Sequence, residues 1–80
     1  MKLREGEIGK TYEVCSVDVE EAITRRLEAL GVNEKTPVKV LNKKRSGTMI
    51  IKVRGTRLAL GCRITDGIRV KEAEGHESQD

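Results

Sequence analysis

Residues 49–60, with the sequence MIIKVRGTRLAL, decide the fold class of this chain. Apolar side chains alternate with polar ones on both sides of Gly55, which is the pattern of two antiparallel strands joined by a tight turn. We assign this turn to Gly55 and Thr56, with glycine first as a type II′ turn requires. Upstream, residues 24–32 read TRRLEALGV, a helical pattern that ends at Gly31. One short helix followed by small hairpins predicts a compact barrel suited to binding rather than to catalysis.

The other elements follow from the same periodicities. A first strand is expected over residues 10–17, and a helix over residues 19–30 with Asp18 as its N-cap and Glu21 completing a capping box. Because Pro37 cannot lie inside a central strand, the next strand should begin near Val38 and reach residue 43 or 44. A loop at residues 45–47 and a short last strand at 68–70 complete the set, and residues 1–8 are expected to form an extended lead-in.

The predicted core is aliphatic, because Tyr12 is the only aromatic residue in the chain. A core of this size usually supplies only about 3–5 kcal/mol of net stability. The residues expected to form it are Val14, Val17, Ile23, Leu27, Leu30, Val38, Val40, Ile51, Val53, Leu58, Leu60, Ile68 and Val70.

Five short strands, with one helix between the first and the second, predict a mainly β, SH3-like barrel. An OB-like barrel competes with it, but its helix more often follows the third strand. We expect one domain over residues 1–72 and a disordered, acidic tail over residues 73–80. No apolar run approaches the roughly 18–20 residues of a membrane span, and the amino terminus has no signal-peptide pattern, so a cytoplasmic location is expected.

The net charge of +3 conceals a strong asymmetry. Residues 35–65 contain nine Lys and Arg residues and no acidic residue, whereas both flanking segments are net negative. This tract is either a basic face that meets nucleic acid or an acidic protein surface, or the outward side of alternating strands. Alternation accounts less well for the cluster at residues 43–45, and the two interpretations stay open at this point. Strand alternation accounts well for Lys39, Lys52, Arg54 and Arg57.

No arrangement of residues indicates catalysis, a cofactor or a metal site. Cys15 and Cys62 are far apart in the sequence and form no C-x-x-C pair, so we expect them in or beside the core as small apolar residues. The single histidine, His76, lies in the polar tail and leaves a metal without a ligand set. A nucleophile–histidine pair and a glycine-rich phosphate loop are also lacking from the sequence.

Several short motifs, taken in order, resemble the FeoA family, the small cytoplasmic proteins that accompany the bacterial ferrous iron transporter FeoB. The resemblance covers roughly residues 6–70. Its main blocks are RRLxxLGV at residues 25–32 and VRGxRLAL at residues 53–60. Two turns depart from the family pattern, where Glu34-Lys35 replaces a Pro-Gly turn and Thr65-Asp66-Gly67 replaces a turn that usually carries alanine. Further matching positions are Gly9, Val14, Val17, Val38, Val40, Gly47, Ile68 and Val70.

The resemblance implies an accessory of ferrous iron uptake that binds the cytosolic face of a FeoB-like transporter, for example its GTPase portion, and it allows weak self-association. The same domain occurs at the end of iron-dependent repressors of the diphtheria toxin repressor type, but here no DNA-binding domain precedes it, so the transport accessory is preferred. Arg25 and Arg26 could equally cover the edge of the core with their stems. The candidate contact residues are Arg25, Arg26, Gly31, Val32, Arg45, Gly47, Arg54, Gly55 and Arg57.

Two other functions compete with this expectation. The basic tract at residues 35–65 could bind nucleic acid, but base stacking needs aromatic platforms and Tyr12 lies outside the tract. Binding would then rest on phosphates and would fall steeply with salt. Direct iron sensing through Cys15, Cys62 or His76 lacks a full ligand set, so neither function is preferred.

Overall fold

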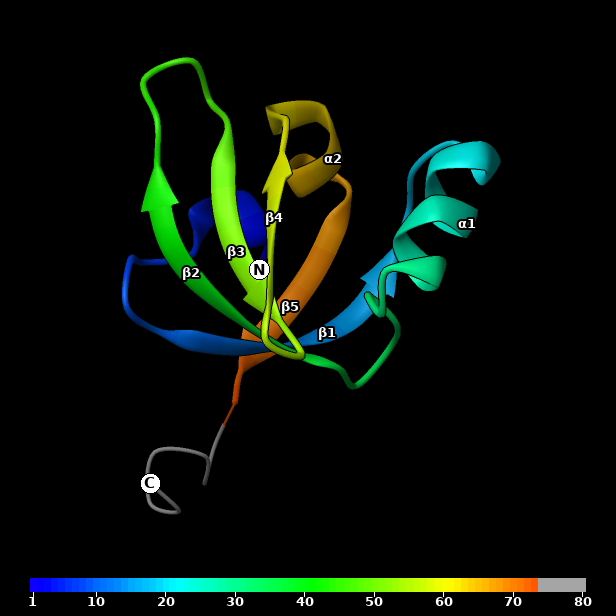
Figure 1. Ribbon diagram of the computed structural model, residues 1–80, viewed down its shortest axis with the longest axis horizontal. Helices are drawn as coiled ribbons and strands as arrows, with labels where there is room; N and C mark the ends of the chain where they lie inside the picture. Colours follow the sequence, from blue (N-terminus) through cyan, green and yellow to red (C-terminus); the bar gives the residue numbers. More distant parts are fainter. Residues whose placement is uncertain (74–80) are drawn as a thin grey trace.

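The computed structural model describes residues 1–73, and the tail expected over 73–80 therefore lies outside the described part except for Ala73, which is buried. The mainly β class, with a helix between the first and second strands, is confirmed. A second short helix precedes the last strand (Figure 1). In chain order the elements are the 3-10 helix η1 (Leu3–Glu5), β1 (Thr11–Val17), α1 (Glu21–Ala29), β2 (Pro37–Lys43), β3 (Met49–Val53), β4 (Thr56–Leu60), α2 (Cys62–Asp66) and β5 (Ile68–Glu72).

The five strands form one antiparallel sheet in the order β4-β3-β2-β1-β5. The expected term barrel overstates the fold, because β4 and β5 are the two edges of the sheet and do not pair with each other. The short helix α2 leads from one edge strand to the other (Figure 1). Register irregularities in the β1–β5 and β2–β3 pairs curve the sheet around its core without closing it.

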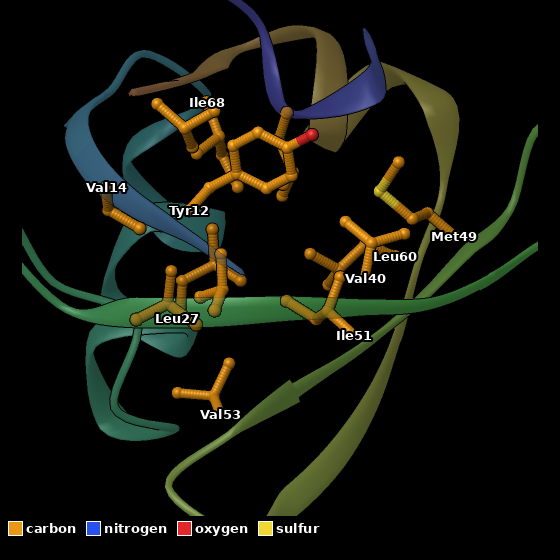
Figure 2. Packing of buried hydrophobic residues seen from close by; sticks show 13 residues of the cluster. Tyr12, Val14, Leu27, Val40, Met49, Ile51, Val53, Leu60 and Ile68 are labelled. Atoms are coloured by element: carbon orange, nitrogen blue, oxygen red, sulfur yellow. The ribbon is translucent and has the colours of Figure 1, made fainter. Parts of the chain in front are cut away.

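The buried side chains come from alternate positions of the strands and from one face of α1 (Figure 2). Tyr12 is the largest of them and is only 2% exposed, while its hydroxyl oxygen accepts a hydrogen bond from the backbone N–H of Glu7 at 2.8 Å. The predicted core is confirmed for Val14, Leu27, Val38, Val40, Ile51, Val53, Leu60, Ile68 and Val70. Val17, Ile23 and Leu58 pack against it but are only partly buried. Its further members Leu3, Tyr12, Val32 and Met49 were not on the predicted list.

The placement of Leu30 in the core is wrong, because its side chain is 42% exposed. The helix ends in a Schellman motif, in which the N–H of Val32 donates to the carbonyl of Leu27 and the N–H of Gly31 donates to the carbonyl of Glu28. Gly31 has a φ of +96°, as expected for the residue after the helix cap. This turn sends Leu30 outward and carries Val32, which is 1% exposed, into the core.

The helix begins later than the sequence predicted. It starts at Glu21 after Glu20 as N-cap, with no side-chain capping bond, so the capping box at Asp18 is not formed. The backbone N–H of Asp18 instead donates to the carbonyl of Gly67 at 2.7 Å. This bond keeps Asp18 beside the turn before β5, and the chain can enter the helix only after it.

The extended lead-in expected over residues 1–8 is also wrong. Residues 3–5 form η1, and the side chain of Leu3 is fully buried. The segment before η1 lies along β5, where the N–H of Val70 donates to the carbonyl of Met1 at 2.8 Å. Because these contacts link the two ends of the described chain, no local pattern in the first eight residues could reveal them.

Candidate protein-binding surface

The turn between β3 and β4 consists of Arg54 and Gly55, because Val53 pairs with Thr56. Both turn residues have positive φ angles, +52° and +84°, which define a type I′ turn. The predicted turn at Gly55-Thr56, of type II′, is therefore wrong by one residue. The backbone of Arg54 has a left-handed conformation, which costs energy for any residue that carries a Cβ atom. Its guanidinium-bearing side chain is thus held at the tip of the hairpin.

This hairpin tip lies against the end of α1. A Cβ atom added to Gly31 would lie 3.1 Å from Cδ of Arg54 and 3.8 Å from a methyl carbon of Val53. Arg54 therefore brings a positive charge to the carboxyl end of a helix, where the free carbonyl groups favour cations. The structure brings together two candidate contact residues here, Gly31 and Arg54, that are far apart in the sequence.

The other hairpin tip, between β2 and β3, contains Arg45 and Gly47. It packs beside α2, since a Cβ added to Gly47 would lie 3.1 Å from Cβ of Cys62. A cleft of about 260 Å³ next to this tip is lined by Arg4, Lys43 and Lys44 among others. Arg4, Lys43 and Lys44 were not among the candidate contact residues, although the cluster at residues 43–45 had drawn attention in the sequence.

The two tips lie at opposite ends of β3 (Figure 1). At about 3.3 Å per residue, the length of this strand separates them by roughly 16 Å. The candidate residues therefore divide into two groups, with Gly31, Arg54 and Gly55 at one end and Arg45 and Gly47 at the other. Arg25 lies on α1, where its guanidinium contacts the Glu21 carboxylate at 3.2 Å, and the exposed Arg26 lies in the last turn of the helix.

The nine cations of residues 35–65 have no ion-pair partner within the described part of the chain. Ion pairs there all involve cations outside this tract, namely Lys2, Arg4, Lys10, Arg25 and Lys71. The charges of the tract are therefore neutralised by solvent and salt, or by a partner.

Three of these cations form a row across the outer face of the sheet. Lys39 of β2 lies opposite Lys52 of β3, and Lys52 lies opposite Arg57 of β4. All three side chains are exposed, which confirms that strand alternation directs them outward. Like charges directly opposite each other on neighbouring strands are destabilising. Alternation accounts for polar side chains at these positions but not for three cations in register, so this row favours a basic binding face.

A separate charge cluster ties η1 to α2. The Lys2 ammonium nitrogen and an Arg4 guanidinium nitrogen each lie 3.1 Å from the same carboxylate oxygen of Asp66. The hydrogen bond from Lys2 is the main reason that the pKa of Asp66 lies below its ordinary value of 3.8, and Arg4 adds to this effect. These ion pairs therefore stabilise the fold above about pH 3.8, and the contribution is lost as the pH falls through the lowered pKa.

Replacing Lys2 with methionine should raise the pKa of Asp66 back toward 3.8, because the largest cause of its depression is removed. An NMR titration of the Asp66 carboxyl carbon measures this directly. Arg4→Met serves as the comparison and should raise the pKa less. An Asp66 carboxyl that titrates at or above 3.8 in the unaltered protein would contradict the ion pairs described here.

Two other expectations about surface groups need correction. Val32 was a candidate contact residue, but the Schellman motif buries it, so its side chain is not available to a partner. Cys15 and Cys62 were expected in or beside the core, but both are exposed free thiols. Cys15 lies at the point where the β1–β5 register shifts, between Val14 and Ser16, and Cys62 opens α2 next to the Gly47 loop.

Over residues 1–73, no group of three or more His, Cys, Asp or Glu side chains is arranged to hold a metal ion. His76 lies outside this range. In the same range, no helix is both long and apolar enough to cross a membrane.

The open five-stranded sheet, its short helices and its basic outer face define a small SH3-like domain. A family model described as FeoA domain matches residues 1–72, and the chain therefore belongs to the FeoA family, which is associated with ferrous iron transport. No curated protein matched the chain in a sequence search.

Solved structures agree with this assignment. The solution structure of FeoA from Chlorobium tepidum is 35% identical, with a TM-score of 0.86, and the match covers 95% of this chain and 76% of that one. The crystal structure of Stenotrophomonas maltophilia FeoA complexed with zinc is 30% identical, with a TM-score of 0.77, and the match covers 89% of each chain. A manganese-dependent transcriptional repressor shares the fold over 90% of this chain and 41% of its own, with a TM-score of 0.82 at 18% identity.

Proposed function

We propose that this protein is a cytoplasmic accessory of ferrous iron uptake that binds the cytosolic part of a FeoB-type transporter by protein–protein contact. The observation that carries this proposal is membership of the FeoA family over residues 1–72. The basic outer face supports it, because nine cations without an ion-pair partner in residues 1–73 suit an acidic protein surface. The protein regulates its partner by docking and needs no catalytic group of its own.

The contact surface of this proposal is centred on the β3–β4 turn and the row of Lys39, Lys52 and Arg57. Arg54 and Gly31 bring the end of α1 to one side of it, and the exposed Leu30 supplies an apolar side chain there. Leu30 is thus the part of the contact that does not depend on salt, because the side chain of Val32 is buried. Arg45 at the far tip contributes to the field that guides the partner toward this face.

Binding to nucleic acid is the second candidate, and the same nine cations favour it. The one aromatic side chain of the chain, Tyr12, is buried, so stacking of bases on it is not available. A nucleic acid would bind through its phosphates alone, and its affinity would fall steeply with salt.

Reversing the charge at Arg45 and Arg57 should slow association with the transporter by at least about tenfold at low salt, because electrostatic steering mainly affects the association rate. Both side chains are exposed, so the fold should be retained. The measurement is surface plasmon resonance with the cognate transporter in nanodiscs, at several salt concentrations.

The matched control for each of the single reversals, Arg45→Glu and Arg57→Glu, is Arg69→Glu, which makes the same charge change on β5 at the opposite edge of the sheet and should leave the rate nearly unchanged. Equal slowing by the control would show that net charge alone matters. Absence of any complex with the transporter, together with retention of RNA or DNA in gel-shift experiments at physiological salt, would replace the transport assignment by the nucleic-acid one.

A further inference from the structure

The fold covers one edge of the sheet with another segment and leaves the other edge uncovered. The edge of β5 is covered by the amino-terminal segment, where Met1 exchanges backbone hydrogen bonds with Val70 and Lys2 forms a bridge with Arg69. The edge of β4 has no such cover, because β4 pairs with β3 alone and no other segment of residues 1–73 forms a backbone hydrogen bond with it. One edge of the sheet is thus closed and the other is open.

The register identifies the backbone groups that face this open edge. In a two-residue hairpin the first pair, here Val53 and Thr56, is hydrogen-bonded, and the hydrogen-bonded pairs then recur at every second residue. Leu58 and Leu60 therefore direct their N–H and C=O groups toward β3. Arg57 and Ala59 direct theirs away from the sheet, which leaves two donors and two acceptors available to another strand.

The open edge lacks the usual features that discourage strand addition. Proteins protect edge strands with proline, with bulges or with several charges. The sequence of β4, TRLAL, contains no proline, its pairing with β3 runs through five pairs without a bulge, and Arg57 is its one charge. Both register irregularities of the sheet lie elsewhere, in the β1–β5 and β2–β3 pairs.

The side chains on β4 indicate what kind of strand fits beside it. Arg57 points to the outer face, where it continues the row of Lys52 and Lys39, so the residue opposite it should be acidic. Leu58 points to the inner face and is only partly buried, so an apolar residue opposite it would complete its burial. The matching segment is therefore extended, with a carboxylate flanked on both sides by apolar side chains.

We propose that β4 binds an extended, acidic segment of a partner protein by strand addition, with a carboxylate opposite Arg57 and an apolar side chain opposite Leu58. The backbone groups of Arg57 and Ala59 supply the affinity, and the charge at Arg57 supplies the selectivity. This binding mode goes beyond the proposed function, because it does not depend on which protein supplies the segment.

A peptide with the sequence Val-Thr-Val-Glu-Val-Thr-Val tests the proposal, because it is palindromic and presents the same side chains in either strand direction. Amide NMR spectra of the full chain should show chemical-shift changes at Arg57 and Ala59 when the peptide is added. Hydrogen exchange should show that the N–H groups of these two residues exchange freely without peptide and become protected with it. The matching peptide with Lys in place of Glu should bind about three- to tenfold more weakly.

Two variants separate this binding mode from general stickiness. Arg57→Glu should reverse the preference, so that the Lys peptide binds more tightly than the Glu peptide. Ala59→Pro removes an outward N–H at an edge position, where proline is tolerated, and should abolish binding while thermal unfolding stays cooperative.

Three results would overturn the proposal. The first is protection of the Arg57 and Ala59 amides in the free protein, which would mean that a second copy or another part of the chain already occupies the edge. The second is a set of peptide-induced shifts confined to other strands. The third is equal binding of both peptides by the unaltered protein and by Arg57→Glu. None of them bears on whether the transporter is bound, which the association measurement decides separately.

Discussion

Replacing Leu27 with alanine should lower the free energy of unfolding by about 2–5 kcal/mol. Leu27 is the fully enclosed side chain of α1, 2% exposed, and it lies among the strand residues of the core (Figure 2). Alanine would remove its contacts and leave a cavity that the short helix cannot fill. Because small domains have little stability in reserve, the variant should be largely unfolded at moderate urea concentrations.

Urea unfolding followed by circular dichroism measures this loss. The matched control is Leu30→Ala, three residues later on the same helix end, whose side chain is 42% exposed. Its loss should stay within about 0.5 kcal/mol, as for most surface positions. If Leu27→Ala were as mild as Leu30→Ala, α1 would not be packed against the sheet in the way described.

Replacing Gly67 with alanine should cost about 1–3 kcal/mol, because the new methyl group would overfill a closely packed site. A Cβ at this position would lie 2.5 Å from the carbonyl oxygen of Asp18 and 2.6 Å from a methyl carbon of Val19. The first of these contacts is with backbone and cannot be relieved by a side-chain rotation. The strain would fall on the segment where β1 leads into α1, which the Asp18–Gly67 hydrogen bond holds in place.

The control for this substitution is Gly61→Ala, at the other end of α2. Gly61 has a φ of −70° and no atom within 4 Å of an added Cβ, so alanine should be tolerated there. Thermal unfolding of the two variants side by side gives the comparison. Equal stability of both variants would show that the β1–α1 connection does not pass as close to Gly67 as the structure places it.

The strands β2, β3 and β4 could be predicted from the sequence because one face of each meets solvent and the other meets the core. This condition produces a period of two that is visible without any knowledge of pairing. The end of α1 was also predictable, because Gly31 supplies a conformation that other residues rarely adopt. The helical period of the apolar side chains did not reveal that the side chain of Leu30 points to solvent.

The features that were not predictable depend on contacts between distant residues. The helix η1 is held by Asp66, and the start of α1 is set by a bond between Asp18 and Gly67. These contacts join segments more than forty residues apart, and no local pattern records them.

The candidate surface was predictable only in part. The acid-free tract at residues 35–65 was evident from composition, but the alignment of Lys39, Lys52 and Arg57 follows from the strand register. The nine candidate residues were taken from two hairpin tips and a helix face, and the structure places the two tips at opposite ends of β3. The choice of Val32 failed because the Schellman motif at Gly31 carries its side chain into the core.

The most direct test of the transport assignment is the initial rate of radioactive ferrous iron uptake in anaerobic, iron-poor cells that lack the gene for this protein. The account predicts a clearly reduced rate, restored by the unaltered protein and restored less well by a variant with Arg45 and Arg57 both changed to Glu. An uptake rate in the deletion strain equal to that of the parent, with the transporter present at the same level, would contradict it.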